Sequence, residues 1–189
     1  LGRIRDAERE LAGDALFARA YEVLADTDVD GERLRRLVRS VSDTVFLVAE
    51  GQQIDVDNED RPEVSREEYL DMVEKKTAVL FACAAEGGAI IGGGTEQQIA
   101  SMKEYARLLG IGFQIWDDEL GIKGDAKKTG KPVGSDIRNG KRTLIVVDAL
   151  ERLEKDQRKH VLTDALGHAN ASDQAVSAAI ELLEDIGSI

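Results

Sequence analysis

Two carboxylates and two lysines in the second half of the chain have types and spacings suited to binding a diphosphate. Asp117 and Asp118 follow the apolar run FQIW, and the segments GKPVGSD and GKRT place Lys131 and Lys141 shortly after them. Adjacent carboxylates supply hard oxygen ligands for Mg²⁺, and lysines act as point charges for phosphate oxygens that the metal also bridges. Flanking glycines let the loop turn tightly beside an anion. The sequence therefore predicts a site in which magnesium and lysine share one diphosphate.

Asp136 lies between the two lysines, where a carboxylate can hold a lysine or a metal-bound water in place.

A nucleotide-binding P-loop does not fit the same segment. Five residues instead of four separate Gly124 from Gly130 and Lys131, and Pro132 replaces the required hydroxyl residue. The segment is therefore better explained by the predicted diphosphate site, in which Asp136 has a supporting role.

These blocks resemble the second aspartate-rich region of the trans-isoprenyl diphosphate synthases, which join isopentenyl diphosphate to an allylic diphosphate. Three further matches precede FQIWDD, GKPVGSD and GKRT in the family's order: residues 13–16 (GDAL), Gly51 and Gln52 with Asp55, and the pair Lys76 and Thr77. Blocks in the correct order over roughly residues 11 to 145 are far more specific than any single motif.

The resemblance implies roles for the charged residues of the site. Lys76, Lys131 and Lys141 would contact the allylic diphosphate. Asp117 would bind a magnesium ion directly and is the better candidate ligand of the pair, with Asp118 beside it. Mg²⁺ is therefore the cofactor that the resemblance implies.

The resemblance also places uncharged polar groups in the site. Thr77 and Gln114 would face the allylic cation beside Lys76, because electron-rich oxygens stabilise developing positive charge without acting as nucleophiles. Gln52 and Asp55 would either contact the substrate or support the site as a hydrogen-bonded pair at a helix end. One position departs from the family: the third aspartate of its pattern, four residues after the first, is Gly121 here.

The predicted elements that position these residues are helical almost throughout. Apolar residues recur at helical spacing before the polar break at residues 26–28 and again over residues 34–48. Capping boxes at Ser65 and Thr95 begin two further helices, the second running to Asp118. These patterns predict an all-α, single-domain helical bundle. The resemblance implies that the bundle is of the isoprenoid synthase type with a central active-site cavity.

The start of the chain bears on domain organisation. It opens on Leu1 within a helical pattern, and the family's first aspartate-rich motif is not found before Gly13. We expect residues 1–189 to be the C-terminal portion of one isoprenyl diphosphate synthase domain, with the upstream helices absent. The alternative is a subunit that lacks this motif and works beside one that has it.

Composition narrows the partners. A net charge of −12 argues against nucleic acid and anionic membrane surfaces. No apolar run reaches membrane-spanning length, so no stable membrane insertion is expected. The lone Cys83 lies in an apolar segment, which predicts a buried thiol and agrees with a cytoplasmic protein.

The resemblance implies a trans-prenyltransferase that works by magnesium-assisted ionisation and forms a homodimer. Its partners would be isopentenyl diphosphate and an allylic diphosphate such as dimethylallyl, geranyl or farnesyl diphosphate. Two alternatives remain open: a noncatalytic partner subunit of a heteromeric synthase, and a class I terpene cyclase. Lys76, Thr77 and the lysine-containing loop favour elongation over cyclisation.

Overall fold

The computed structural model of the chain describes residues 2–59, 61–124 and 133–189. Within these residues the chain forms helices and no strand, which confirms the predicted all-α class. The long helices are α1 (Gly2–Ala25), α2 (Gly31–Glu59), α4 (Val79–Ile91) and α5 (Glu96–Lys123). The shorter ones are α3 (Arg66–Val73), the π-helix η1 (Glu74–Ala78), α7 (Ser135–Arg138), α8 (Leu144–Arg152), α9 (Lys159–Thr163) and α10 (Asp173–Asp185).

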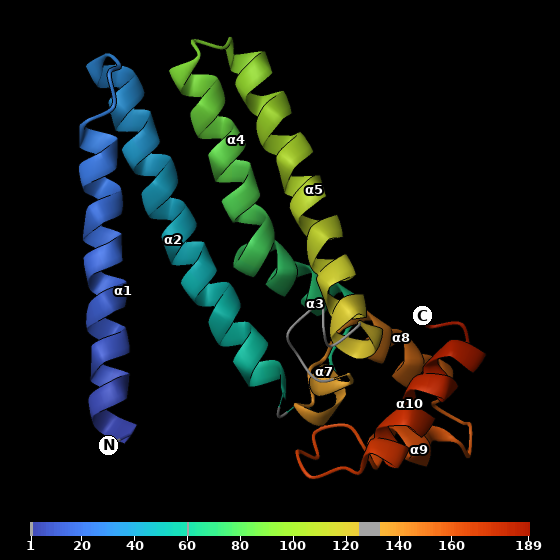
Figure 1. Cartoon of the computed structure of the whole chain (residues 1–189). Helices are drawn as coiled ribbons and strands as arrows, with labels where there is room; N and C mark the ends of the chain where they lie inside the picture. The colour runs from blue at the N-terminus through green and yellow to red at the C-terminus, as the bar shows by residue number, and fades with distance from the viewer. Residues whose placement is uncertain (1, 60, 125–132) are drawn as a thin grey trace.

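The long helices stand side by side, and the short C-terminal helices gather at one end of them (Figure 1). α1 and α2 run antiparallel, as do α4 and α5, and α2 packs against both η1 and α4. Helices α7 to α10 lie near the ends of α2 and α5 (Figure 1). The residues of the predicted site are therefore carried to the same end of the bundle.

Both predicted capping boxes are confirmed. The Ser65 hydroxyl accepts a hydrogen bond from the Glu68 backbone N–H at 3.1 Å, and the Glu68 carboxylate accepts the Ser65 N–H at 2.8 Å. Thr95 and Gln98 form the same reciprocal pair at the start of α5. The predicted end of α5 was wrong, because the helix continues past Asp118 to Lys123. The two aspartates therefore lie more than one turn before the C-terminus of α5.

Three apolar clusters hold the helices together. The largest joins the end of α5 to the C-terminal helices and contains Ile122, Ile137, Ile145, Leu153, Leu162, Val176 and Leu183. A second lies beneath α3 and contains Val64, Tyr69, Met72, Val73 and Val147. The third, formed by Leu37, Ile90 and Ile99, packs α2, α4 and α5 at the far end of the bundle. The two larger clusters therefore lie at the end of the bundle that carries the predicted site residues.

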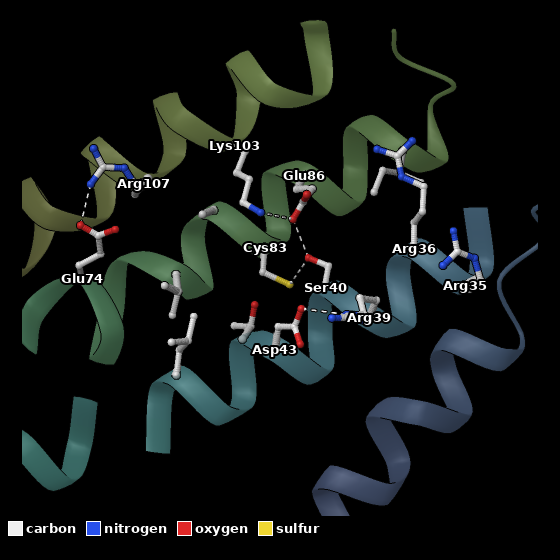
Figure 2. Close-up of a pocket in the computed structure, with 15 residues that line it drawn as sticks. Arg35, Arg36, Arg39, Ser40, Asp43, Glu74, Cys83, Glu86, Lys103 and Arg107 are labelled. Atoms are coloured by element: carbon white, nitrogen blue, oxygen red, sulfur yellow. Dashed lines mark hydrogen bonds and ion pairs between the residues drawn. The ribbon is translucent and has the colours of Figure 1, made fainter. Parts of the chain in front are cut away.

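A polar cavity of 420 Å³ separates α2, α4 and α5 along one face (Figure 2). The Glu86 carboxylate accepts hydrogen bonds from the Ser40 hydroxyl at 2.6 Å and pairs with the Lys103 ammonium at 3.0 Å, so it links all three helices. Arg107 on α5 pairs with Glu74 of η1 at 2.8 Å. Cys83 borders this cavity and is half-buried, whereas its apolar segment predicted a buried thiol.

No helix in the described ranges combines the length and apolar character needed to cross a membrane.

Candidate active site

Two glycines allow neighbouring helices to approach the π-helix η1 closely. A Cβ at Gly51 of α2 would lie 2.7 Å from the Lys75 carbonyl carbon and closer still to the Lys76 nitrogen. A Cβ at Gly110 of α5 would lie 2.7 Å from the Ala78 Cα. Both separations are too short for real side chains, because interiors are close-packed. Glycine at these positions therefore brings α2 and α5 against the segment that carries Lys76 and Thr77; π-helical turns of this kind often mark functional sites.

Lys76 is fixed by an ion pair with α2. Its ammonium lies 2.5 Å from the carboxylate of Asp55, which is 8% exposed. The partner of Asp55 is thus Lys76, and not Gln52 as in the expected helix-end pair. Gln52 is exposed and makes no side-chain hydrogen bond within the described residues. Because an ammonium has three donors, Lys76 retains donors for a second anion.

Thr77 and Gln114 meet across η1 and α5. The Thr77 hydroxyl donates to the Gln114 side-chain carbonyl at 2.7 Å. The Gln114 amide in turn donates to the Asp118 carboxylate at 3.0 Å, one helical turn further along α5. The structure therefore joins these three residues, which the sequence analysis placed in the same site, in one chain of hydrogen bonds.

Asp118 is the centre of this network and is 2% exposed. Besides Gln114, it accepts hydrogen bonds from the Tyr69 hydroxyl at 2.7 Å and the Lys141 ammonium at 2.6 Å. A buried charge is tolerated only when it is paired and hydrogen-bonded, and these donors meet that condition. Both Asp118 oxygens are thereby engaged by the protein itself.

The protonation states of the two main partners follow from this arrangement. Burial raises the pKa of Tyr69 well above its usual value, and the adjacent Asp118 charge raises it further, so the hydroxyl stays protonated and donates. Burial alone would lower the pKa of Lys141, but the charge of Asp118 and its hydrogen bond outweigh that effect and leave the pKa raised. Lys141 therefore remains an ammonium at neutral pH.

Asp117 differs from its neighbour. It is only partly buried, and within the described residues its carboxylate makes no hydrogen bond or ion pair. Those residues also contain no cluster of three or more acidic, histidine or cysteine side chains arranged around a metal. Mg²⁺ nevertheless commonly binds through one or two carboxylates, with water and substrate phosphates completing its octahedron. In that form Asp117, whose carboxylate is left without a partner within the described residues, could hold a magnesium ion together with a substrate phosphate.

Asp136 lies next to this network in the short helix α7, which follows α5 in the chain. It is 8% exposed and its carboxylate lies 3.7 Å from the Lys141 ammonium. Gly134 and Gly140 flank it with φ angles of 69° and 74°, a left-handed conformation that favours glycine. Lys131, the other predicted diphosphate ligand, lies outside the described residues.

The surroundings of the site are open and apolar along α5. Phe113, Trp116 and Leu120 are 54%, 62% and 39% exposed, and they lie on the side of the helix that carries Asp117. Within the described residues, the polar cavity of Figure 2 is not lined by the residues of this network. Two ion pairs lie within its lining, Lys103 with Glu86 and Arg107 with Glu74.

Tyr69 is the partner that the sequence did not reveal. Its spacing with Met72 and Val73 predicts a member of an apolar stripe, which is correct for its ring. A buried tyrosine usually finds a hydrogen-bond partner for its hydroxyl, but spacing does not say which one. In the sequence, therefore, only the residue type of Tyr69 indicated that its hydroxyl would have a hydrogen-bond partner.

Comparison with known proteins identifies the family. Residues 9–183 match the profile described as polyprenyl synthetase. The chain belongs to the polyprenyl synthetase family. The matched range includes every residue of the candidate active site described above.

Several relatives in this family are similar along most of the chain. A short chain isoprenyl diphosphate synthase of Methanothermobacter thermautotrophicus is 43% identical over 178 residues, covering 94% of this chain and 54% of the relative. The crystal structure of a geranylgeranyl pyrophosphate synthetase from Pyrococcus horikoshii superposes with a TM-score of 0.84 at 39% identity, covering 94% of this chain and 54% of that one.

A third polyprenyl synthetase carries ligands. The structure of a geranylgeranyl pyrophosphate synthase from Corynebacterium glutamicum, complexed with isoprenyl diphosphate and magnesium, has a TM-score of 0.85 at 32% identity. It covers 94% of this chain and 50% of that one. The chain thus spans about half the length of the relatives it matches.

Proposed function

We propose that this chain forms part of a magnesium-dependent trans-prenyltransferase that condenses isopentenyl diphosphate with an allylic diphosphate. The observation that carries the proposal is the connected network from Thr77 through Gln114 and Asp118 to Lys141, in a chain 43% identical to a named isoprenyl diphosphate synthase. The names of the relatives favour this function over a noncatalytic subunit or a terpene cyclase.

The charged residues would hold and activate the diphosphate. Lys76, Lys131 and Lys141 would donate to its oxygens, with Asp55 and Asp118 keeping two of these lysines in place. Magnesium, bound by Asp117 and the diphosphate, would act as a Lewis acid on the leaving group.

Thr77 and Gln114 would stabilise the positive charge that develops on the allylic carbon. Because the Thr77 hydroxyl donates its hydrogen bond to the Gln114 side-chain carbonyl, its lone pairs are left to face the substrate. A fixed oxygen dipole at that point favours the ionised transition state. The apolar side chains along α5 would line the allylic tail and keep water from the cation.

Substrate range and assembly are part of the same proposal. Dimethylallyl, geranyl or farnesyl diphosphate would serve as the allylic partner. We infer a homodimer because α1 makes few contacts beyond α2 and exposes Leu11, Leu16 and Val23. Exposed apolar surface of this kind is typical of an interface.

Calorimetric titration with farnesyl diphosphate, with and without Mg²⁺, tests the proposal. We expect binding that requires the metal and that weakens by roughly tenfold or more in Lys131→Ala, the loss expected for a hydrogen bond to a charged group. Lys155→Ala, an exposed lysine outside the site, is the matched control. Equal losses in both variants, or binding that ignores magnesium, would contradict the proposal. Longer prenyl diphosphate formed from isopentenyl and farnesyl diphosphates would establish the reaction.

A further inference from the structure

Two ion pairs tie the π-helix η1 to the long helices beside it and have no part in the candidate active site. Glu74, the first residue of η1, pairs with Arg107 of α5 at 2.8 Å (Figure 2). The next residue, Lys75, pairs with Glu50 of α2 at 2.8 Å. We call these two contacts the anchor pairs. The two residues that follow belong to the candidate active site and contact the same two helices, so η1 is held on both sides.

The cation of each anchor pair is oriented by an acid of its own helical segment. Two nitrogens of Arg107 donate to the Glu104 carboxylate at 2.8 and 2.9 Å, and a third donates to Glu74. Lys75 likewise pairs with Asp71, one turn earlier in α3, at 2.9 Å. A cation that is already held in place loses little further side-chain freedom when it forms a second contact. Both anchor pairs therefore restrict the position of η1.

The π-turn itself depends on contacts with its surroundings, because helices rarely adopt this conformation. The Val79 N–H donates to the Glu74 carbonyl, five residues earlier, whereas a regular α-helix uses the carbonyl four residues earlier. The turn therefore contains one extra residue. Its conversion to α-helix would rotate one side of it against the other by about 100° and would carry Lys76 or Thr77 away from its partner.

We propose that the anchor pairs are positioning contacts: they hold the π-turn, and the turn directs Lys76 and Thr77 towards the substrate. Their action on the conformation of η1 stands on the geometry alone, whereas the effect on ligand binding rests on the proposed function. Ion pairs that are partly exposed contribute little to stability. Loss of an anchor pair should therefore alter the geometry of the site more than the stability of the fold.

Nuclear magnetic resonance of the chain without ligand tests the conformational part. Arg107→Met should shift the Thr77 methyl and Val79 amide resonances, whereas Arg107→Lys, which can keep the ion pair, should leave them in place. Glu50→Gln, on the opposite side of η1, should move the same resonances in the same direction, because it releases the same turn. In urea denaturation, the unfolding equilibrium constant should change by less than about fivefold in each variant.

Lys103→Met is the matched control for these shifts. Lys103 lies one turn before Arg107 on α5 and pairs with Glu86 of α4 at 3.0 Å, beyond the π-turn (Figure 2). Its substitution removes a comparable ion pair from the same cavity and should leave the resonances of η1 unmoved. Unmoved resonances in Arg107→Met, or equal shifts in Lys103→Met, would overturn the proposal.

Calorimetric titration with magnesium and farnesyl diphosphate tests the effect on the site. The dissociation constant should rise about tenfold in Arg107→Met and in Glu50→Gln, because Lys76 then loses a well-placed bond to a charged group. Lys103→Met and Arg107→Lys should bind as the unaltered chain does. Unchanged affinity in both Arg107→Met and Glu50→Gln would overturn the positioning role. If the unaltered chain bound no farnesyl diphosphate, the proposed function would fall, and the resonance shifts would still decide whether the anchor pairs hold the turn.

Discussion

Asp117 and Asp118 are adjacent in sequence, but Asp118 is buried and hydrogen-bonded, whereas Asp117 is partly exposed and makes no side-chain interaction within the described residues. Asp118 is 2% exposed and accepts hydrogen bonds from Tyr69, Gln114 and Lys141. Asp118→Asn should lower the free energy of unfolding by about 3–5 kcal/mol, because it leaves a buried ammonium without its carboxylate. Urea denaturation measures the change.

Asp117→Asn is the matched comparison for this prediction. Its carboxylate is only partly buried and makes no interaction within the described residues, so the unfolding free energy should change by less than about 0.5 kcal/mol. Magnesium-dependent binding of farnesyl diphosphate should nevertheless weaken by roughly tenfold or more. Similar stability losses in the two variants would show that the division between a structural and a ligand-facing aspartate is wrong.

For single residues, the sequence predicted which side chains belong to the site better than it predicted their hydrogen-bond partners. It grouped Thr77, Gln114 and the aspartates in one site, and the structure brings Thr77, Gln114 and Asp118 into one network. It did not reveal that Lys141 pairs with Asp118, or that Tyr69 does so too. Those contacts join segments far apart in the chain, and helical periodicity carries no signal for such pairs.

Because α2 packs closely on the π-helix η1, a larger residue at Gly51 should change the position of one helix relative to the other. Gly51→Ala would push a methyl group into the Lys75–Lys76 backbone, so α2 and η1 must separate. The unfolding free energy should fall by about 1–3 kcal/mol, the usual cost of overpacking. The Lys76–Asp55 ion pair spans the same two elements, so diphosphate affinity should fall as well.

Gly88→Ala on α4 is the control for this substitution. Gly88 is exposed, and nothing lies within 4 Å of a Cβ built there. Alanine at this site should stabilise the protein by about 0.5–1 kcal/mol through helix propensity alone. A destabilising effect equal to that of Gly51→Ala would mean that η1 is not the cause.

Some helix boundaries are set by hydrogen bonds between residues close in sequence, and others are set by packing against distant parts of the chain. The capping boxes at Ser65 and Thr95 involve side chains three residues apart, so the sequence was enough to predict them. The π-helical turn at Glu74–Ala78 was not predicted, because it places residues against Gly51 and Gly110 of other helices. The extension of α5 to Lys123 likewise depends on Ile122, which is buried in the C-terminal core.

Asp148 links three parts of the whole molecule. Its carboxylate accepts hydrogen bonds from Arg66 at the start of α3, Arg152 of α8 and Ser188 near the C-terminus, at 2.6, 2.6 and 2.7 Å. Burial alone would raise the pKa of Asp148, but these hydrogen bonds outweigh it and hold the pKa below its ordinary value. A depressed carboxyl pKa means that the stabilisation is present above the unfolded-state pKa, about 3.9. It is lost as the pH falls through the folded-state value.

Asp148→Asn should therefore lower the unfolding free energy at pH 7 by about 1–3 kcal/mol. The difference from the unaltered chain should shrink as the pH falls below about 4, because the carboxyl group is protonated first in the unfolded state and then, below its depressed pKa, in the folded state as well. Urea denaturation across pH measures both effects. Asp173→Asn removes an exposed partner of Arg138 and should cost at most about 1 kcal/mol. A constant difference for Asp148→Asn down to pH 2 would contradict the linkage.

Two apolar surfaces on opposite parts of the bundle give the last prediction, because we expect them to have different occupants. α1 exposes Leu11, Leu16 and Val23, whereas α5 exposes Phe113 and Trp116 beside Asp117. The proposed homodimer would cover the surface on α1, and the allylic tail would cover that on α5. Trp116 is the only tryptophan, so its fluorescence reports on the α5 surface alone.

Leu16→Lys should shift the chain from dimer to monomer in sedimentation experiments, because a charge on the α1 surface opposes its burial. The emission maximum of Trp116 should be the same in both forms and should move to shorter wavelength when magnesium and farnesyl diphosphate are added. Glu22→Lys, a charge change at an exposed polar position of the same helix, is the control and should leave the assembly intact. A blue shift on dimerisation without ligand would instead place the second copy on α5, since only burial of Trp116 in an apolar environment produces that change.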